Sequence, residues 1–152
     1  MNPRVEIQIA SREKNLPAEE RLQQWAQTVL ELNAADAEVV IRIVDEEESR
    51  RLNDRYRGRD KPTNVLSFPF EAPPGVPVNH IGDLVVCAPV ISAEAGLQGK
   101  PLEHHWAHMV VHGILHLRGH DHTTTEDADH MESLERELLQ DMGIPDPYSE
   151  KQ

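Results

Sequence analysis

Hydrophobic residues recur with two different periods along the chain, and its first thirty positions show one of each. Val5, Ile7 and Ile9 alternate with polar residues, which predicts a strand with one buried face. Pro17 suits the first turn of a helix, where the missing N–H costs nothing. The apolar residues that follow at helical spacing are Leu22, Trp25, Ala26, Val29 and Leu30. We therefore expect a strand followed by an amphipathic helix.

The next segment predicts a second strand and a second helix. Residues 33–36 read as a connector, and residues 37–44 are rich in β-branched side chains, which favour strands. Asp45 can cap a helix that runs through residues 52–56, and Gly58 can end it.

Two further strands are predicted by short apolar runs at residues 63–68 and 81–88. The residues that make the segment between them a loop are Pro69, Pro73, Pro74, Gly75 and Pro77. Pro89 starts another helix, which ends near Gly99.

Two more helices complete the pattern. One starts at Pro101 and has an apolar stripe beside a histidine stripe. The apolar stripe is Leu102, Trp106, Met109, Val110, Gly113 and Leu117, and the histidine stripe is His108, His112 and His116. The last helix runs from about residue 126 to 142. Its inward residues are expected to be Ala128, Met131, Leu134 and Leu138. The fold class is therefore α/β (α+β): one domain over residues 1–152, with a small mixed four-stranded sheet packed with about five helices.

The segment HGILHLRGHDH, residues 112–122, predicts a metal site. Two histidines four positions apart lie on one side of a helix, so His112 and His116 can share an ion. Gly119 can end the helix in a left-handed conformation, and His122 can then approach the same point. Three imidazoles leave a fourth tetrahedral position open, as in catalytic zinc sites. The spacing matches the metzincin pattern of zinc proteases at every ligand and at the glycine.

Other interpretations of this segment stay open. Gly113 stands where the metzincin proteases carry their general-base glutamate, which argues against peptide cleavage. Seven of the nine histidines fall between His104 and His122, so a different pair such as His108 with His112 could also bind an ion. We prefer His112, His116 and His122 because this choice alone uses Gly119 to bring in a ligand from outside the helix.

The distribution of charged residues along the chain bears on the choice of partner. The formal net charge of −12 argues at first against a nucleic-acid partner. Six of the fifteen basic residues nevertheless fall within twelve positions: Arg50, Arg51, Arg55, Arg57, Arg59 and Lys61. Such a cluster can hold a phosphodiester, although a solvated helix face would have the same composition. Cys87 is the single cysteine and no apolar run is long enough to span a bilayer, so we expect a cytoplasmic protein.

The chain resembles the YbeY family of bacterial endoribonucleases over residues 39–148. The resemblance rests on residues 52–70 (LNDRYRGRDKPTNVLSFPF), residues 81–86 (IGDLVV) and residues 112–122. One difference is His120, since members usually carry tyrosine there.

The resemblance implies a zinc-dependent, single-strand-specific endoribonuclease. Its expected roles are maturation of the 3′ end of 16S rRNA, late assembly of the small ribosomal subunit and ribosome quality control. It implies one zinc ion on His112, His116 and His122, and a functional arginine at Arg57. The expected partners are single-stranded RNA, ribosomal RNA and small-subunit proteins, with neither membrane nor DNA. These expectations agree with the residues, because a divalent ion and a guanidinium can both stabilise a phosphoryl group.

The roles of several residues follow from this chemistry. Arg57, His112 and His116 are the candidate catalytic residues, and Arg55, Arg57, Arg59 and Lys61 are the candidate RNA-binding residues. Asp121 could accept a proton or orient a ligating histidine. The attacking group stays open between water on the metal and the 2′-hydroxyl of RNA. Two other functions also remain: a non-catalytic assembly factor stabilised by zinc, and a metallopeptidase.

Overall fold

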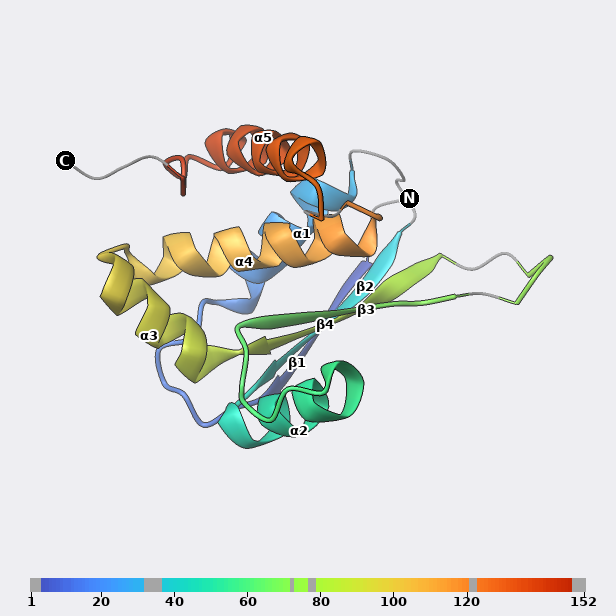
Figure 1. Ribbon diagram of the computed structural model, residues 1–152. Coiled ribbons are helices and arrows are strands. Elements are labelled where there is room, and N and C mark those ends of the chain that lie inside the picture. Colours follow the sequence, from blue (N-terminus) through green and yellow to red (C-terminus); the bar gives the residue numbers. More distant parts are fainter. Residues whose placement is uncertain (1–3, 32–36, 72, 77–78, 121–122, 149–152) are drawn as a thin grey trace.

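The computed structural model describes residues 4–31, 37–71, 73–76, 79–120 and 123–148, and these carry nine helices and strands. In chain order they are β1 (Arg4–Ala10), α1 (Glu19–Leu30), β2 (Glu38–Val44), α2 (Glu46–Arg57), β3 (Val65–Pro69), β4 (His80–Cys87), α3 (Ala88–Gln98), α4 (Leu102–Leu117) and α5 (Thr125–Asp141). The predicted fold class, with a mixed four-stranded sheet and five helices, is confirmed for this part of the chain (Figure 1).

The sheet has the order β1-β2-β4-β3. β2 lies parallel to both β1 and β4, whereas β3 pairs antiparallel with β4 at the edge. Alternate residues of each central strand face opposite sides, because the side-chain period of a strand is two. Apolar side chains on both faces of the sheet must therefore be buried by other elements.

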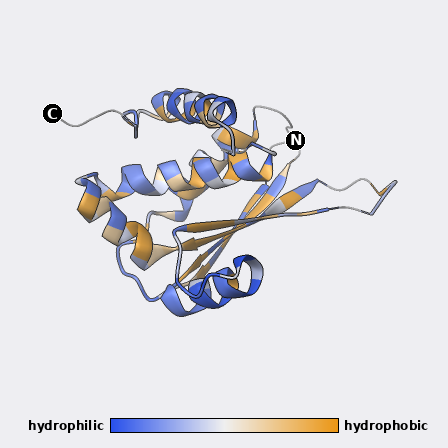
Figure 2. Cartoon of the chain, in the orientation of Figure 1, coloured by the Kyte–Doolittle hydropathy of each residue, from blue (hydrophilic) through white to orange (hydrophobic). Residues whose placement is uncertain are grey.

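Helices cover the two faces unequally. α1 and α4 pack on one face and α5 lies outside α4, while α2 lies on the other face (Figure 1). The larger core contains Ile41, Ile43, Leu84 and Val86 with side chains of α1, α4 and α5. The smaller core, under α2, contains Val44, Leu66, Val85 and Cys87. Figure 2 shows the strands and the inner helix faces as mostly hydrophobic and α2 as mostly hydrophilic.

Three local expectations differ from the structure. α1 begins at Glu19, two residues after Pro17. Asp45 occupies the N-cap position of α2, but its carboxylate accepts hydrogen bonds from the Ser11 hydroxyl and the Arg12 amide instead of from the helix. Pro69 is the last residue of β3 rather than part of the loop, which an edge strand tolerates because proline needs no ladder partner at its end. The expected connector at 33–36 and Pro77 lie outside the described residues.

α4 is the helix that the fold buries most completely. It lies between the sheet and α5, so its two long sides both face protein (Figure 1). Its C-terminal half borders a groove that residues of α2 and β3 also line. As predicted, Gly119 follows the end of this helix in a left-handed conformation, with φ of 90°.

Candidate active site

His112 and His116 lie one turn apart in the C-terminal half of α4, and their ring planes are 74° apart. The two Nε2 atoms are 3.2 Å apart. Ligand nitrogens around a tetrahedral zinc ion with Zn–N bonds of 2.0–2.1 Å are separated by about 3.3 Å. The pair therefore fits a shared metal ion. Of the other candidates in this motif, His122 and Asp121 lie outside the described residues.

These two histidines line a groove of about 580 Å³. Its other lining residues come from the end of α2 and from the segment that leads through β3: Tyr56, Arg57, Asn64, Val65, Leu66, Ser67 and Phe68. The groove thus brings Arg57 and the histidine pair together, although more than fifty positions separate them in the sequence. Two of the three segments on which the family resemblance rests, residues 52–70 and 112–122, therefore line the same groove.

Hydrogen bonds from buried polar side chains of α2 fix the loop that follows Arg57. Gly58 ends α2 with φ of 69°. Asn53 then donates from Nδ2 to the Lys61 carbonyl at 2.8 Å. The Ser49 hydroxyl donates to the Thr63 carbonyl at 3.1 Å and accepts from the Thr63 amide at 3.0 Å. Ser49 and Asn53 are each 1% exposed, so these bonds form away from solvent and fix the loop after α2.

The basic cluster divides into two parts. Arg50 pairs with Asp60 and Glu47, and Arg51 lies 3.9 Å from the same Glu47. The four remaining cations are exposed and form no ion pair with the described acidic residues; they are Arg55, Arg57, Arg59 and Lys61. Among the described residues, the four predicted RNA-binding residues are therefore the cations of this cluster that have no acidic partner.

Two aromatic rings stand beside these cations. Tyr56 is 57% exposed and meets Phe68 edge to face, with ring centroids 5.1 Å apart. The Arg55 guanidinium lies 5.4 Å from the centre of the Tyr56 ring. An exposed ring flanked by cations is the combination that binds unpaired bases of a nucleic acid.

Gly113 faces the sheet and not the groove. A Cβ atom at this position would lie 2.9 Å from Cδ2 of Leu84 and 3.2 Å from Cγ2 of Val65. The Ser67 hydroxyl donates to the Gly113 carbonyl at 3.0 Å. Glycine is required here for the close approach of α4 to β3 and β4, and a glutamate would have to displace core side chains.

Glu135 of α5 is the buried acidic residue behind the histidine pair. Its Oε1 lies 2.9 Å from Nδ1 of His112, and its Oε2 lies 2.7 Å from Nε2 of His108 and 2.6 Å from the Tyr148 hydroxyl. Burial raises the pKa of Glu135, but the hydrogen bonds from His108, His112 and Tyr148 outweigh burial and lower this pKa to about 2. The carboxylate is therefore ionised and accepts all three hydrogen bonds. Burial, followed by the bond to Glu135, raises the pKa of Tyr148, which stays a donor.

His108, His112 and Glu135 also form a group of donor atoms that could hold a metal ion. Their contacts of 2.7 and 2.9 Å have the length of hydrogen bonds and are shorter than the about 3.3 Å between ligands of one tetrahedral zinc. The His112–His116 pair at 3.2 Å fits a metal better. The two arrangements use different nitrogens of His112, since Nδ1 contacts Glu135 and Nε2 approaches His116.

The sequence interpretation missed Glu135 and Tyr148. Glu135 lies four residues after Met131 and four before Leu139, and all three are buried on one face of α5. An acidic residue in an apolar stripe was the signal that could have revealed it. His120, which could have competed for the metal, has its ring 5.5 Å from that of His130.

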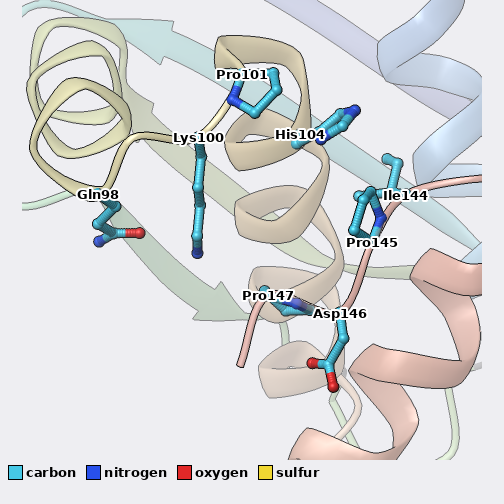
Figure 3. Close-up of a pocket in the computed structure, with 8 residues that line it drawn as sticks. All are labelled: Gln98, Lys100, Pro101, His104, Ile144, Pro145, Asp146 and Pro147. Atoms are coloured by element: carbon cyan, nitrogen blue, oxygen red, sulfur yellow. The ribbon is translucent and has the colours of Figure 1, made fainter. Parts of the chain in front are cut away.

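A second hollow, of about 470 Å³, lies at the other end of α4. Figure 3 shows it between Gln98, Lys100, Pro101 and His104 on one side and residues 144–147 on the other. His104 and His116 are separated by twelve residues of helix, or about 18 Å along the axis. This hollow is therefore separate from the groove. Among the described residues, no helix is long and apolar enough to cross a membrane.

An exposed arginine and paired imidazoles in one groove are the kind of site found in enzymes that act on phosphodiester bonds. The family model for Endoribonuclease YbeY matches residues 6–143. The chain belongs to the YbeY endoribonuclease family, so the predicted activity, cleavage of RNA by a hydrolase in rRNA processing, is confirmed at this level.

One solved structure similar to this chain is the solution structure of TM1509 from Thermotoga maritima. The two share 27% sequence identity and a TM-score of 0.59, over 95% of this chain and 99% of that one. The likeness therefore extends over both chains almost completely.

Proposed function

We propose that the protein is a zinc-dependent, single-strand-specific endoribonuclease. Its proposed roles are maturation of the 3′ end of 16S rRNA, late assembly of the small ribosomal subunit and ribosome quality control. The observation that supports this best is the groove that Arg57 lines together with His112 and His116, whose Nε2 atoms are 3.2 Å apart. Residues 1–152 are proposed to form one endoribonuclease domain.

One zinc ion would be held by His112, His116 and His122. The donor set supports this proposal, because the Nε2 atoms of two imidazoles already lie at the separation of two zinc ligands. A bound zinc ion supplies a positive charge that polarises a phosphoryl oxygen and acidifies water. The buried negative charge of Glu135 behind His112 favours a cation on that side of the protein.

Arg57 is proposed to hold the phosphoryl oxygens of the scissile bond. A guanidinium can donate to two such oxygens at once, and the negative charge on them grows as the bond breaks. Arg55, Arg59 and Lys61 extend the positive surface along the chain that leaves the groove. They are proposed to bind the neighbouring phosphates.

The preference for single strands is supported by Tyr56. Its exposed ring can stack only on a base that is not already stacked and paired in a duplex. The 2′-hydroxyl of RNA lies next to the scissile phosphate and can attack it, so DNA is expected to be a poor substrate. Asp121 is proposed as a proton acceptor or as an orienting group for a histidine.

The packing at Gly113 opposes peptide cleavage. The metzincins carry their general base at this position. Here the space that such a side chain would need is filled by the side chains of Leu84 and Val65. Ribosomal RNA, small-subunit proteins and the cytoplasm are proposed as partners and location on the basis of the family's RNA-processing activity.

The test is cleavage of one RNA sequence as single strand and as duplex, with the matching DNA strand and casein as further substrates. Protein of verified zinc content and the His116→Ala variant are compared in the same assay. We expect zinc-dependent cleavage of the single-stranded RNA alone, and its loss in His116→Ala.

Two results would contradict the proposal in different ways. RNA cleavage that persists in His116→Ala would indicate a contaminating nuclease and would favour the non-catalytic assembly factor. Casein cleavage that disappears in this variant would favour the metallopeptidase.

A further inference from the structure

Glu135 is placed as a buried acceptor between two histidines of α4. It is 1% exposed, and it approaches them from α5, on the side of His112 that faces away from His116. We propose that Glu135 is a positioning residue that holds His112 with Nε2 directed at the metal. This inference rests on the proposed zinc site and names a residue that neither motif of the chain contains.

The ring geometry of His112 supports this role. The two nitrogens of an imidazole point to different sides of the ring, and here Nδ1 lies 2.9 Å from Glu135 while Nε2 lies 3.2 Å from His116. A carboxylate 2.9 Å from Nδ1 can accept a hydrogen bond from it. The nitrogen left for a metal is then Nε2, on the side of His116. Histidine ligands commonly donate their other N–H to a carboxylate in this way.

The second oxygen of Glu135 keeps the carboxylate in place. Oε2 lies 2.7 Å from Nε2 of His108 and 2.6 Å from the hydroxyl of Tyr148. His108 is buried and comes from the preceding turn of α4, whereas Tyr148 follows α5. Glu135 is thus held by α4 and by the segment that follows α5, which leaves His112 one favoured ring orientation.

Glu135 also contributes charge. Its three described partners are His108, His112 and Tyr148, and none of these is a lysine or arginine. A buried carboxylate without a permanent cation nearby is costly. A divalent ion on the far side of His112 would lower that cost, so the same residue both orients the ligand and favours the metal.

The experiment measures zinc affinity of the apoprotein by competition with a chromophoric chelator, with folding checked by circular dichroism. Glu135→Leu removes the acceptor, whereas Glu135→Gln keeps an oxygen that can accept from Nδ1 of His112. The matched control is Glu94→Leu, because Glu94 makes a similar 2.9 Å contact with the buried His105 on the same helix. We expect Glu135→Leu to weaken zinc binding by about 10- to 100-fold, Glu135→Gln to weaken it less, and Glu94→Leu to leave it unchanged.

A second measurement covers the case in which Glu135→Leu does not fold. Long-range proton–nitrogen NMR of the wild-type apoprotein reports which nitrogen of His112 carries hydrogen. We expect Nδ1–H, and zinc then bound at Nε2. An Nε2–H tautomer, or zinc on Nδ1, would overturn the proposal.

Two further variants separate this proposal from the proposed zinc site. If His116→Ala binds zinc as the wild type does, the zinc site itself is wrong. If His116→Ala loses zinc while a folded Glu135→Leu binds it normally, only the role of Glu135 is wrong. His108→Gln distinguishes a direct ligand from a positioning network: retained zinc supports the network, and complete loss would mean that His108 and Glu135 bind the ion themselves.

Discussion

The side chain of Leu84 occupies the space that any side chain at Gly113 would need. A Cβ atom on Gly113 would lie 2.9 Å from Cδ2 of Leu84, well inside van der Waals contact. α4 consequently packs onto β4 more closely than a larger residue would allow without a shift of Leu84.

Gly113→Glu should destabilise the protein by about 3 kcal/mol or more, because it forces a carboxylate into an apolar contact. Gly96→Glu is the matched control, since a Cβ on Gly96 of α3 meets nothing within 4 Å. That variant should unfold near the wild-type denaturant midpoint. Urea unfolding of both variants measures the difference. A stable Gly113→Glu protein that cleaves peptides would show that position 113 reaches the metal after all.

Arg57→Ala should lower the turnover of single-stranded RNA by about 100-fold, because it removes a charge that faces the developing negative charge of the transition state. Its melting temperature should stay near that of the wild type, since Arg57 is exposed. Arg51→Ala serves as control, because Arg51 lies on the same helix next to Glu47 and outside the groove. Equal losses of activity in both variants would indicate general charge attraction and not a specific contact.

Tyr56→Ala should raise KM for single-stranded RNA about tenfold, since stacking of one base on an aromatic ring contributes roughly 1–3 kcal/mol. Tyr56→Trp should restore binding, because the indole also presents a flat face. Phe70→Ala is the comparison, as Phe70 is another exposed aromatic ring but packs on His80 away from the groove. An unchanged KM in Tyr56→Ala would remove this ring from the RNA-binding surface.

His105 should make the apoprotein less stable below neutral pH. Burial lowers the pKa of His105 below its ordinary 6.5, more than the bond to Glu94 raises it. Its Nδ1 is buried and has no described hydrogen-bond partner, so a proton there would have no acceptor. The unfolded chain therefore binds more protons, and this contribution to stability is complete above pH 6.5 and lost as pH falls toward the folded pKa.

Urea unfolding of wild type and His105→Gln from pH 8 to pH 5 isolates this effect, because the other histidines titrate in both proteins. The stability difference between the two proteins should shrink as the pH falls. A difference that stays constant would mean that His105 does not titrate differently in the folded state.

Local patterns were enough to predict the helices and strands, since hydrophobic period, proline and glycine act within a few residues. The sequence also indicated Arg57, because one of the segments that carry the resemblance contains it, and Arg57 lines the same groove as the two histidines. The role of Glu135 could not be predicted from local patterns, because its partner His112 lies 23 residues away in the sequence. Only the packing of α5 on α4 brings the two residues together. The same holds for Asp45, whose carboxylate was expected to cap its own helix but bonds to residues after β1.

The bonds that Ser49 and Asn53 make with the loop after α2 have a consequence for the entropy of binding. Ordering a loop on association costs about 1–2 kcal/mol for each residue whose backbone becomes fixed. Here the backbone at Lys61 and Thr63 is already fixed in the free protein. The loss of conformational entropy on association then falls mainly on the RNA strand. A flexible strand loses more of this entropy than a stiff one, so the two should bind with different affinities.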